Sequence, residues 1–193
     1  MRVPLKSLRT QAQHPRVQSN PDNAERLAYL LTRCDEQQGY SGALLIIAPT
    51  GRPIAFHYTR PIKPTPLHRT LYGASLETFV RGHLIGASLL QAARLRLDLL
   101  LVADAELLVL RPEFDVPMAC PSAAERSSSV PHTRAECIAE TAWYLHVAHL
   151  DTDRERLSNW LERVGGVEVL VEPFERVRAA LDQLVHGTGA EAA

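Results

Sequence analysis

A cysteine and a histidine in the second half of the chain are the residues best suited to covalent chemistry. Cys120 ends a short apolar run, and His132 closes the Ser/Pro-rich segment that follows it. A cysteine nucleophile needs a lowered thiol pKa and a base within hydrogen-bond distance. No known nucleophile motif surrounds Cys120, so a hydrolase or transferase that uses this thiol is the third of three functional hypotheses.

Asp104 is a further candidate because it follows another apolar run. Ligands of open α/β sheets sit beyond the carboxyl ends of the strands, which is where Asp104 is expected to lie. An aspartate at this position is also suited to capping the helix that follows, and capping is the role that the sequence favours.

Residues with metal-ligating side chains are concentrated in one stretch of thirty residues. The set comprises Cys120, His132, Cys137, His146 and His149. Zinc needs such ligands to converge in a tetrahedron, and their spacing matches no standard zinc motif. Gly-x-Ser-x-Gly and the P-loop are also absent from the sequence. We therefore expect no metal and no cofactor.

Residues 52–83 carry a strong excess of cations over a single acid, Glu77. Arginine and lysine neutralise phosphates, and aromatic faces stack on bases. The candidate binding residues for an anion or a nucleic acid are Arg52, Arg60, Lys63, Arg69, Tyr72 and Arg81. Prolines at 61, 64 and 66 keep part of this segment extended. The alternative is a rigid crossover in which Arg60 and Arg69 pair with acids of the second half.

Charge is divided unequally between the two halves of the chain. The first 96 residues hold 13 Lys/Arg and 5 Asp/Glu, whereas the remaining residues hold 8 and 17. The basic half could meet an anion. The two halves could also attract each other within the fold or between subunits.

Composition indicates a globular chain in a reducing compartment. The 193 residues are 46% hydrophobic and 22% charged, and the cysteines number only three. We expect one domain over residues 20–187, a flexible basic tail over 1–19 and a loose tail over 188–193. No segment has the length of a membrane span, so a cytoplasmic protein that does not bind membranes is expected.

The elements of the first half are predicted from hydrophobic periodicity. Apolar residues at i, i+3, i+4 and i+7 predict a helix over residues 21–38. A buried strand over 43–48 and an alternating strand over 54–58 form a hairpin. A long helix over 75–97 follows. Gly82 and Gly86 leave one of its faces without side chains, so another helix is expected to approach there closely.

The second half alternates between strands and helices. Strands are predicted over 99–103, 116–120 and 167–171, and helices over 107–110, 133–148, 152–164 and 174–185. This order indicates an α/β fold. We expect a layered domain with a mixed sheet flanked by helices, in which the N-terminal hairpin is antiparallel and the later strands are parallel.

Three functions are therefore compatible with the sequence. The first is a non-enzymatic binding or assembly protein that docks a protein partner, or a second copy of itself, through a charged surface. The alternative is a nucleic-acid- or phosphate-binding accessory protein that uses segment 52–83 and the N-terminal tail. The cysteine enzyme comes third.

Overall fold

A seven-stranded mixed sheet forms the centre of the computed structural model, which describes residues 25–122 and 130–187. The strands follow the order β3-β2-β1-β4-β5-β7-β6 across the sheet. The predicted α/β class with a mixed sheet is confirmed. The strands are β1 (Leu27–Asp35), β2 (Gly39–Ile47), β3 (Pro53–Tyr58), β4 (Leu99–Val102), β5 (Met118–Pro121), β6 (Thr133–Ile138) and β7 (Thr141–His146).

Parallel pairing is confined to the middle of the sheet. Strand β1 pairs with β4 in parallel, and β4 pairs with β5 in the same way. The hairpins β1–β2, β2–β3 and β6–β7, together with the β5–β7 pair, are antiparallel. The carboxyl ends of β1, β4 and β5 therefore meet at one edge of the sheet.

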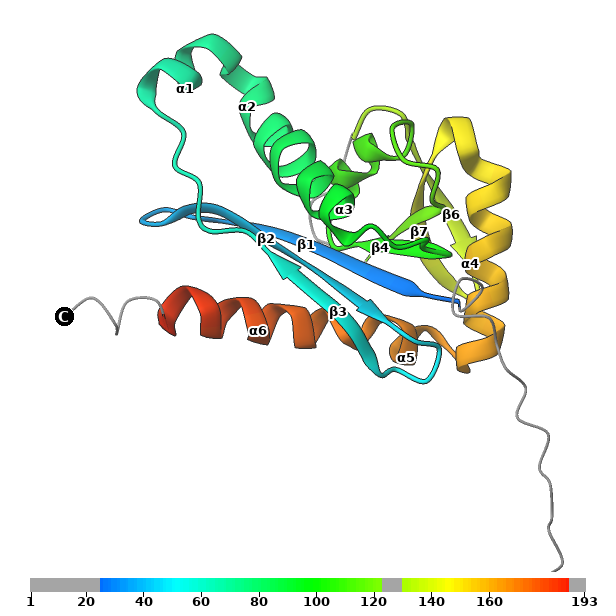
Figure 1. Cartoon of the computed structure of the whole chain (residues 1–193). Helices are drawn as coiled ribbons and strands as arrows, with labels where there is room; N and C mark the ends of the chain where they lie inside the picture. Colours follow the sequence, from blue (N-terminus) through cyan, green and yellow to red (C-terminus); the bar gives the residue numbers. More distant parts are fainter. Residues whose placement is uncertain (1–24, 123–129, 188–193) are drawn as a thin grey trace, which may run out of the picture.

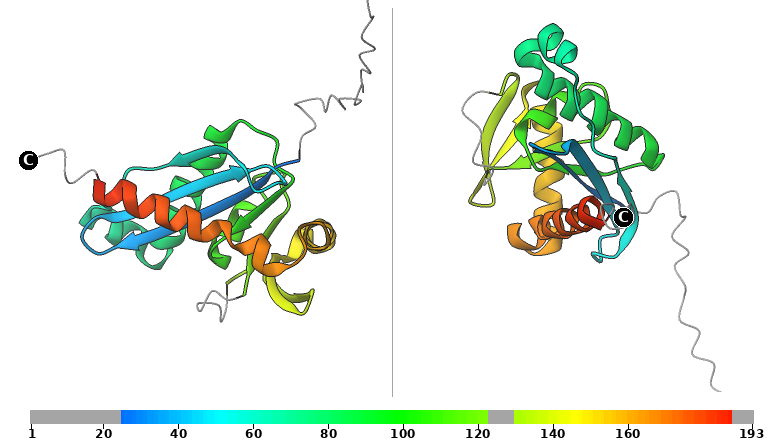
Figure 2. Two further views of the ribbon diagram at one scale, coloured as in Figure 1. Left: turned by 90° about the horizontal axis from the view of Figure 1, so that it is seen from below. Right: turned by 90° about the vertical axis from the view of Figure 1, so that its left-hand side faces the viewer.

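Helices cover both faces of the sheet (Figures 1 and 2). Because side chains alternate along a strand, Leu30 and Leu44 pack into one core, whereas Tyr29 and Leu45 pack into the other. The first core lies beneath α2 (Leu76–Thr78), the π-helical segment η3 (Phe79–Gly86), α3 (Ala87–Ala93) and the 3-10 helix η4 (Ala105–Leu110). The second lies beneath α4 (Leu150–Val164), α5 (Val167–Val171) and α6 (Pro173–Gly187).

Helix α1 (Pro66–Tyr72) stands away from the sheet and buries none of its residues (Figure 1). An extended connector, residues 59–65, leads to it from β3. The connector is anchored by a bridge between Tyr40 and Ile62. Thr65 caps α1 through a capping box with His68, in which the two residues exchange side-chain to backbone hydrogen bonds.

The expected close approach at Gly82 and Gly86 is confirmed. A Cβ atom on Gly86 would lie 2.7 Å from a methyl of Leu110, and one on Gly82 would lie 3.0 Å from Val109. Both contacts belong to η4. The two glycines therefore let the long helix pack directly on the short helix that follows β4.

The helix predicted over residues 21–38 is wrong, because residues 27–35 form β1. All residues from Leu27 to Thr32 are buried, so this strand is covered on both faces. A continuous apolar run of this kind satisfies the helical and the buried-strand patterns equally well. Pairing with β2 and β4 decides between them.

Two further predictions in the second half are wrong. Residues 133–146 form the hairpin β6–β7, which turns at Ala139 and Glu140, both with positive φ. Neither residue type marks such a turn in a sequence. Residues 167–171 form helix α5 rather than a strand, and Leu170 of this helix is buried in the second core.

The predicted tails at 1–19 and 188–193 lie outside the described residues. Among the described helices, none combines the length and the apolar character that crossing a bilayer requires.

Candidate functional site

A buried arginine and three carboxylates gather where β1 and β4 end. Arg81, on η3, is only 8% exposed, and its Nε donates to the hydroxyl of Thr32 at 2.9 Å. Its guanidinium forms ion pairs with Asp104, with Glu77 at 3.2 Å and with Glu106 at 3.4 Å. One guanidinium therefore binds three carboxylates and links β1, α2 and η3 to the start of η4. These carboxylates act as partners of a fixed cation.

This cluster was only partly visible in the sequence. Asp104 is the N-cap residue of η4, but its side chain binds Arg81 and makes no capping hydrogen bond. Glu77 and Arg81 have the i, i+4 spacing of a helical ion pair, which is a usable signal. Glu106 and Thr32 carry no comparable signal, because their approach depends on strand order.

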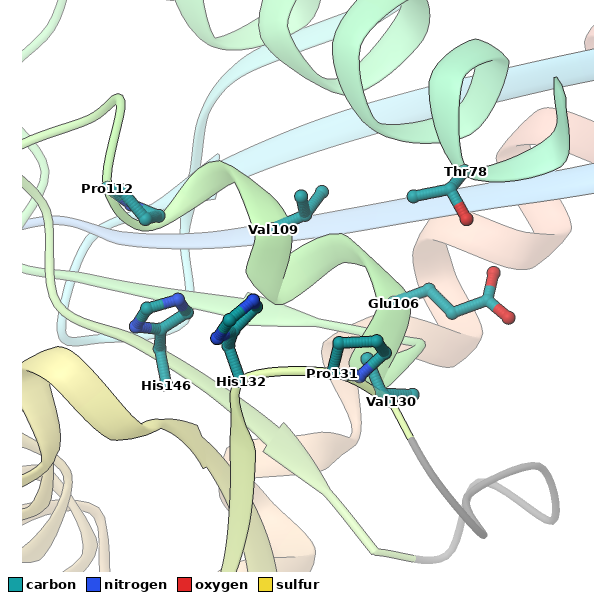
Figure 3. Close-up of a pocket in the computed structure, with 8 residues that line it drawn as sticks. All are labelled: Thr78, Glu106, Val109, Pro112, Val130, Pro131, His132 and His146. Atoms are coloured by element: carbon teal, nitrogen blue, oxygen red, sulfur yellow. The ribbon is translucent and has the colours of Figure 1, made fainter. Parts of the chain in front are cut away.

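A cavity of about 300 Å³ lies next to the carboxylate cluster (Figure 3). His132 and His146 lie at one end, and Glu106 and Thr78 at the other. The remaining lining is apolar and comprises Val109, Pro112, Val130 and Pro131. This volume is at the lower limit of small-molecule sites, and the polar ends offer both donors and acceptors.

Three histidines form a row beside this cavity. The ring of His146 lies 6.2 Å from that of His132 and 5.8 Å from that of His149. His146 is buried, and its Nδ1 accepts a hydrogen bond from the backbone N–H of Ala148 at 3.2 Å. Burial lowers the pKa of His146, neighbouring His149 and His132 lower it further, and Asp153 opposes them. The neutral imidazole is therefore favoured.

Stability is expected to decrease on acidification through His146. Its pKa in the folded state lies below the ordinary value of about 6.5, so the unfolded chain binds the proton more tightly. The contribution of this residue is complete above about pH 6.5 and is lost as the pH falls below that value towards the pKa of the folded state.

Chemical denaturation between pH 5 and 8 measures the effect. The variant H146N, whose amide oxygen can accept the Ala148 hydrogen bond, should reduce the decline, whereas the control H57N should leave it intact. An unchanged decline in H146N would exclude His146 as its source.

The three residues that were candidates for catalysis occupy different places. His132 lines the cavity, and Asp104 binds Arg81. Cys120 is fully buried, and burial raises its pKa well above that of a free thiol, with a further contribution from the charge of Asp104. Its Sγ donates weakly to the carbonyl of Pro121 at 3.5 Å. This environment disfavours the thiolate that nucleophilic attack requires.

The five metal-ligating side chains do not converge on one point, although the three histidines lie in a row. Cys137 is exposed on β6, whereas Cys120 is buried in β5. Across residues 25–122 and 130–187, no group of three or more His, Cys, Asp or Glu side chains has the geometry to hold a metal ion.

The candidate cations separate into one exposed group and two isolated residues. Arg60 and Lys63 are exposed on the connector, and Arg69 is exposed on α1. None of the three forms an ion pair with a described residue. Arg52 is also exposed, but it precedes β3, whereas the connector follows β3, and the strand between them is about 20 Å long. Arg81 is buried.

Tyr72 completes the exposed group from the last turn of α1. Its ring is stacked on Phe79 with centroids 4.5 Å apart, and the residue is 37% exposed. We call Arg60, Lys63, Arg69 and Tyr72 the connector surface.

Attraction between the oppositely charged halves does occur within the fold. Arg33 of β1 pairs with Asp182 of α6, and Arg81 pairs with Asp104 and Glu106. In a further ion pair, the acid Glu25 comes from the first half of the chain and the base Arg163 from the second half. Part of the charge asymmetry is therefore neutralised internally, while the connector surface is not.

Comparison with known proteins finds similarity at the level of structure. No protein-family model matches the sequence, and no curated protein matches it. Human ENDOV matches with a TM-score of 0.55 and 12% identity over 88% of this chain and 89% of that one. Endonuclease V of Ciona intestinalis, crystallised as D234N with an inosine-containing DNA, matches with a TM-score of 0.47 and 11% identity over 84% and 87%. The chain thus has an α/β fold that resembles the fold of endonuclease V.

Proposed function

We propose that this protein binds nucleic acid through the connector surface. The observation that carries the proposal is that the connector and α1 carry three exposed cations with no acid paired to any of them among the described residues. Lys63 lines a cavity together with Tyr72, and Arg69 lies one helical turn before Tyr72 on α1. Cations placed in this way neutralise backbone phosphates, and an aromatic ring beside them adds stacking on bases. A protein of the same fold, human ENDOV, is an endonuclease by its name, which supports nucleic acid as the class of ligand.

The geometry of the connector also supports the proposal. Pro61, Pro64 and Pro66 restrict the backbone that carries Arg60 and Lys63, and the bridge at Ile62 fixes it to the sheet. Side chains on a preorganised backbone bind with a smaller loss of conformational entropy. The N-terminal tail adds four cations to the chain, although it lies outside the described residues.

Binding of a labelled 20-nucleotide oligonucleotide to the full chain, followed by fluorescence anisotropy, tests the proposal. We expect binding at about 50 mM salt that weakens as salt is raised, because counterions are released from the phosphates. The variant R60A/K63A/R69A should weaken binding about tenfold or more and reduce the slope of log K against log salt by about 2.

The charge-matched control is R154A/R156A/R178A, which removes three exposed arginines from α4 and α6 on the other face. It should bind nearly as tightly as the parent. Absence of binding at low salt, or an equal loss in both triple variants, would refute the proposal.

A protein partner or self-association is the second candidate function. Leu67 and Leu71 are exposed by 64% and 70% on the same face of α1. Sedimentation of the parent and of the connector-surface variant in the binding buffer distinguishes the two functions. A stable dimer without oligonucleotide binding would favour self-association.

A further inference from the structure

A second cavity lies directly against the connector surface. Its volume is about 220 Å³, and it lies between the connector and the helical segment from α1 to η3. Lys63, His68 and Tyr72 contribute its polar and aromatic lining. The remaining lining is apolar and comprises Ile62, Pro64, Leu76, Phe79, Val80 and Leu84. The cavity therefore combines an apolar floor with a cation and an aromatic ring from the connector surface.

Aromatic rings are already stacked beside this cavity. Tyr72 and Phe79 are inclined by only 27° at 4.5 Å, and Phe79 is followed by His83 at 6.2 Å. Tyr72 ends this row, and a substantial part of its surface remains exposed. The exposed part of Tyr72 is therefore available to a further planar ring. A nucleobase is such a ring, and its stacking on an aromatic side chain is tolerant of sequence.

The lining is held in place before any ligand arrives. His68 Nδ1 accepts a hydrogen bond from the N–H of Thr65 at 3.3 Å, and the Thr65 hydroxyl accepts one from the N–H of His68 at 3.2 Å. The capping box fixes the start of α1 relative to the connector. It thereby orders the backbone between Lys63 on the connector and the helix that carries Tyr72.

We infer that the connector surface selects single-stranded nucleic acid and stacks one unpaired base on Tyr72 at this cavity. The inference rests on the proposed function. In a duplex, both faces of each internal base are occupied by neighbouring bases, so such a base reaches Tyr72 only after unstacking, at a cost of a few kcal/mol. In a single strand the same base is accessible, while Arg60, Lys63 and Arg69 neutralise flanking phosphates.

Two comparisons test the inference with the full chain. The first compares the affinity for a single strand with the affinity for a blunt duplex of the same length and sequence at equal salt, and we expect at least tenfold tighter binding of the single strand. The second compares the affinities of the variants Y72A and Y72F and of the control variant Y58A for the single strand. Tyr58 is an equally suitable tyrosine for removal, since it is 52% exposed on β3 and faces Phe56 at 6.2 Å.

The variants separate stacking from charge. Y72A should weaken single-strand binding about tenfold without changing the salt slope, because it removes a stacking ring and no cation. Y72F should retain the affinity, and Y58A should bind like the parent. Circular dichroism of Y72A checks that α1 is retained, and Y72F keeps the test valid if it is not.

The possible failures are distinguishable. Equal affinity for duplex and single strand, or equal effects of Y72A and Y58A, would overturn the inference while leaving salt-dependent binding through the cations intact. Failure of Y72F to bind would also overturn it. If neither oligonucleotide binds, the proposed function fails together with the inference.

Discussion

Replacing Arg111 by methionine should lower the free energy of unfolding by about 3–5 kcal/mol, the largest effect that we expect from a single substitution. Arg111 and Asp153 form a buried ion pair whose side chains are 4% and 0% exposed. Nε of Arg111 lies 3.0 Å from both carboxylate oxygens, and its Nη1 donates to the carbonyl of Phe114 at 3.1 Å. The variant R111M leaves Asp153 as a buried charge without its partner.

The electrostatics of Asp153 supports this expectation. Burial raises the pKa of its carboxyl, and the hydrogen bond and charge of Arg111 counteract the increase. Removing Arg111 therefore removes the main interaction that stabilises the ionised form. Denaturation by urea at pH 7 measures the loss.

A second variant shows whether the unpaired charge of Asp153 causes the stability loss of R111M. R111M/D153N replaces the carboxylate by a neutral amide, so it should recover most of the stability that R111M loses. R178M serves as a surface control, because Arg178 and Glu175 are both exposed and such pairs contribute about 0–1 kcal/mol. A loss below about 1 kcal/mol in R111M, or a double variant as unstable as the single one, would contradict this account.

Replacing Arg81 by methionine should lower the free energy of unfolding by about 2 kcal/mol. This loss is smaller than the loss at Arg111 because the partners of Arg81 are partly solvated. The carboxylates of Asp104, Glu106 and Glu77 are 26%, 39% and 47% exposed. Without the guanidinium, three negative charges remain close together, and Thr32 loses the donor to its hydroxyl. Thermal unfolding at pH 7 should show a lower Tm than that of the parent.

The salt dependence of the R81M variant identifies the mechanism. Added salt screens the repulsion among the three carboxylates, so the stability difference from the parent should shrink as salt is raised. A loss caused only by poorer packing would not change with salt. The variant R81K restores the charge but cannot reach several partners at once, so it should recover only part of the stability.

Much of the sheet was predictable because its strands have strong local signals. The hairpin of β2 and β3 and the buried strand β4 follow from apolar runs and alternation, and each needs only short-range information. The error at β1 has a physical reason, since a strand buried on both faces has no polar face to reveal its period. The hairpin β6–β7 depends on two positive-φ residues that are not glycine.

The candidate site was less predictable than the fold. Arg60, Lys63, Arg69 and Tyr72 could be proposed because their residue types suggest binding wherever they are exposed. Arg81 belongs to the same stretch of sequence, yet it is buried among carboxylates. Cys120 and His132 are close in the chain, but one is in the core and the other lines a cavity.

The sequence by itself determined the residue types, the charge asymmetry and the order of most strands and helices, because these depend on local composition and spacing. Only the tertiary structure decided which charges are neutralised. The parallel pairing of β1 with β4 brings Thr32 next to Asp104, and packing of η3 on both inserts Arg81 between them. Pairing of strands distant in sequence depends on the whole core, so the division between buried and exposed cations is a property of the folded chain.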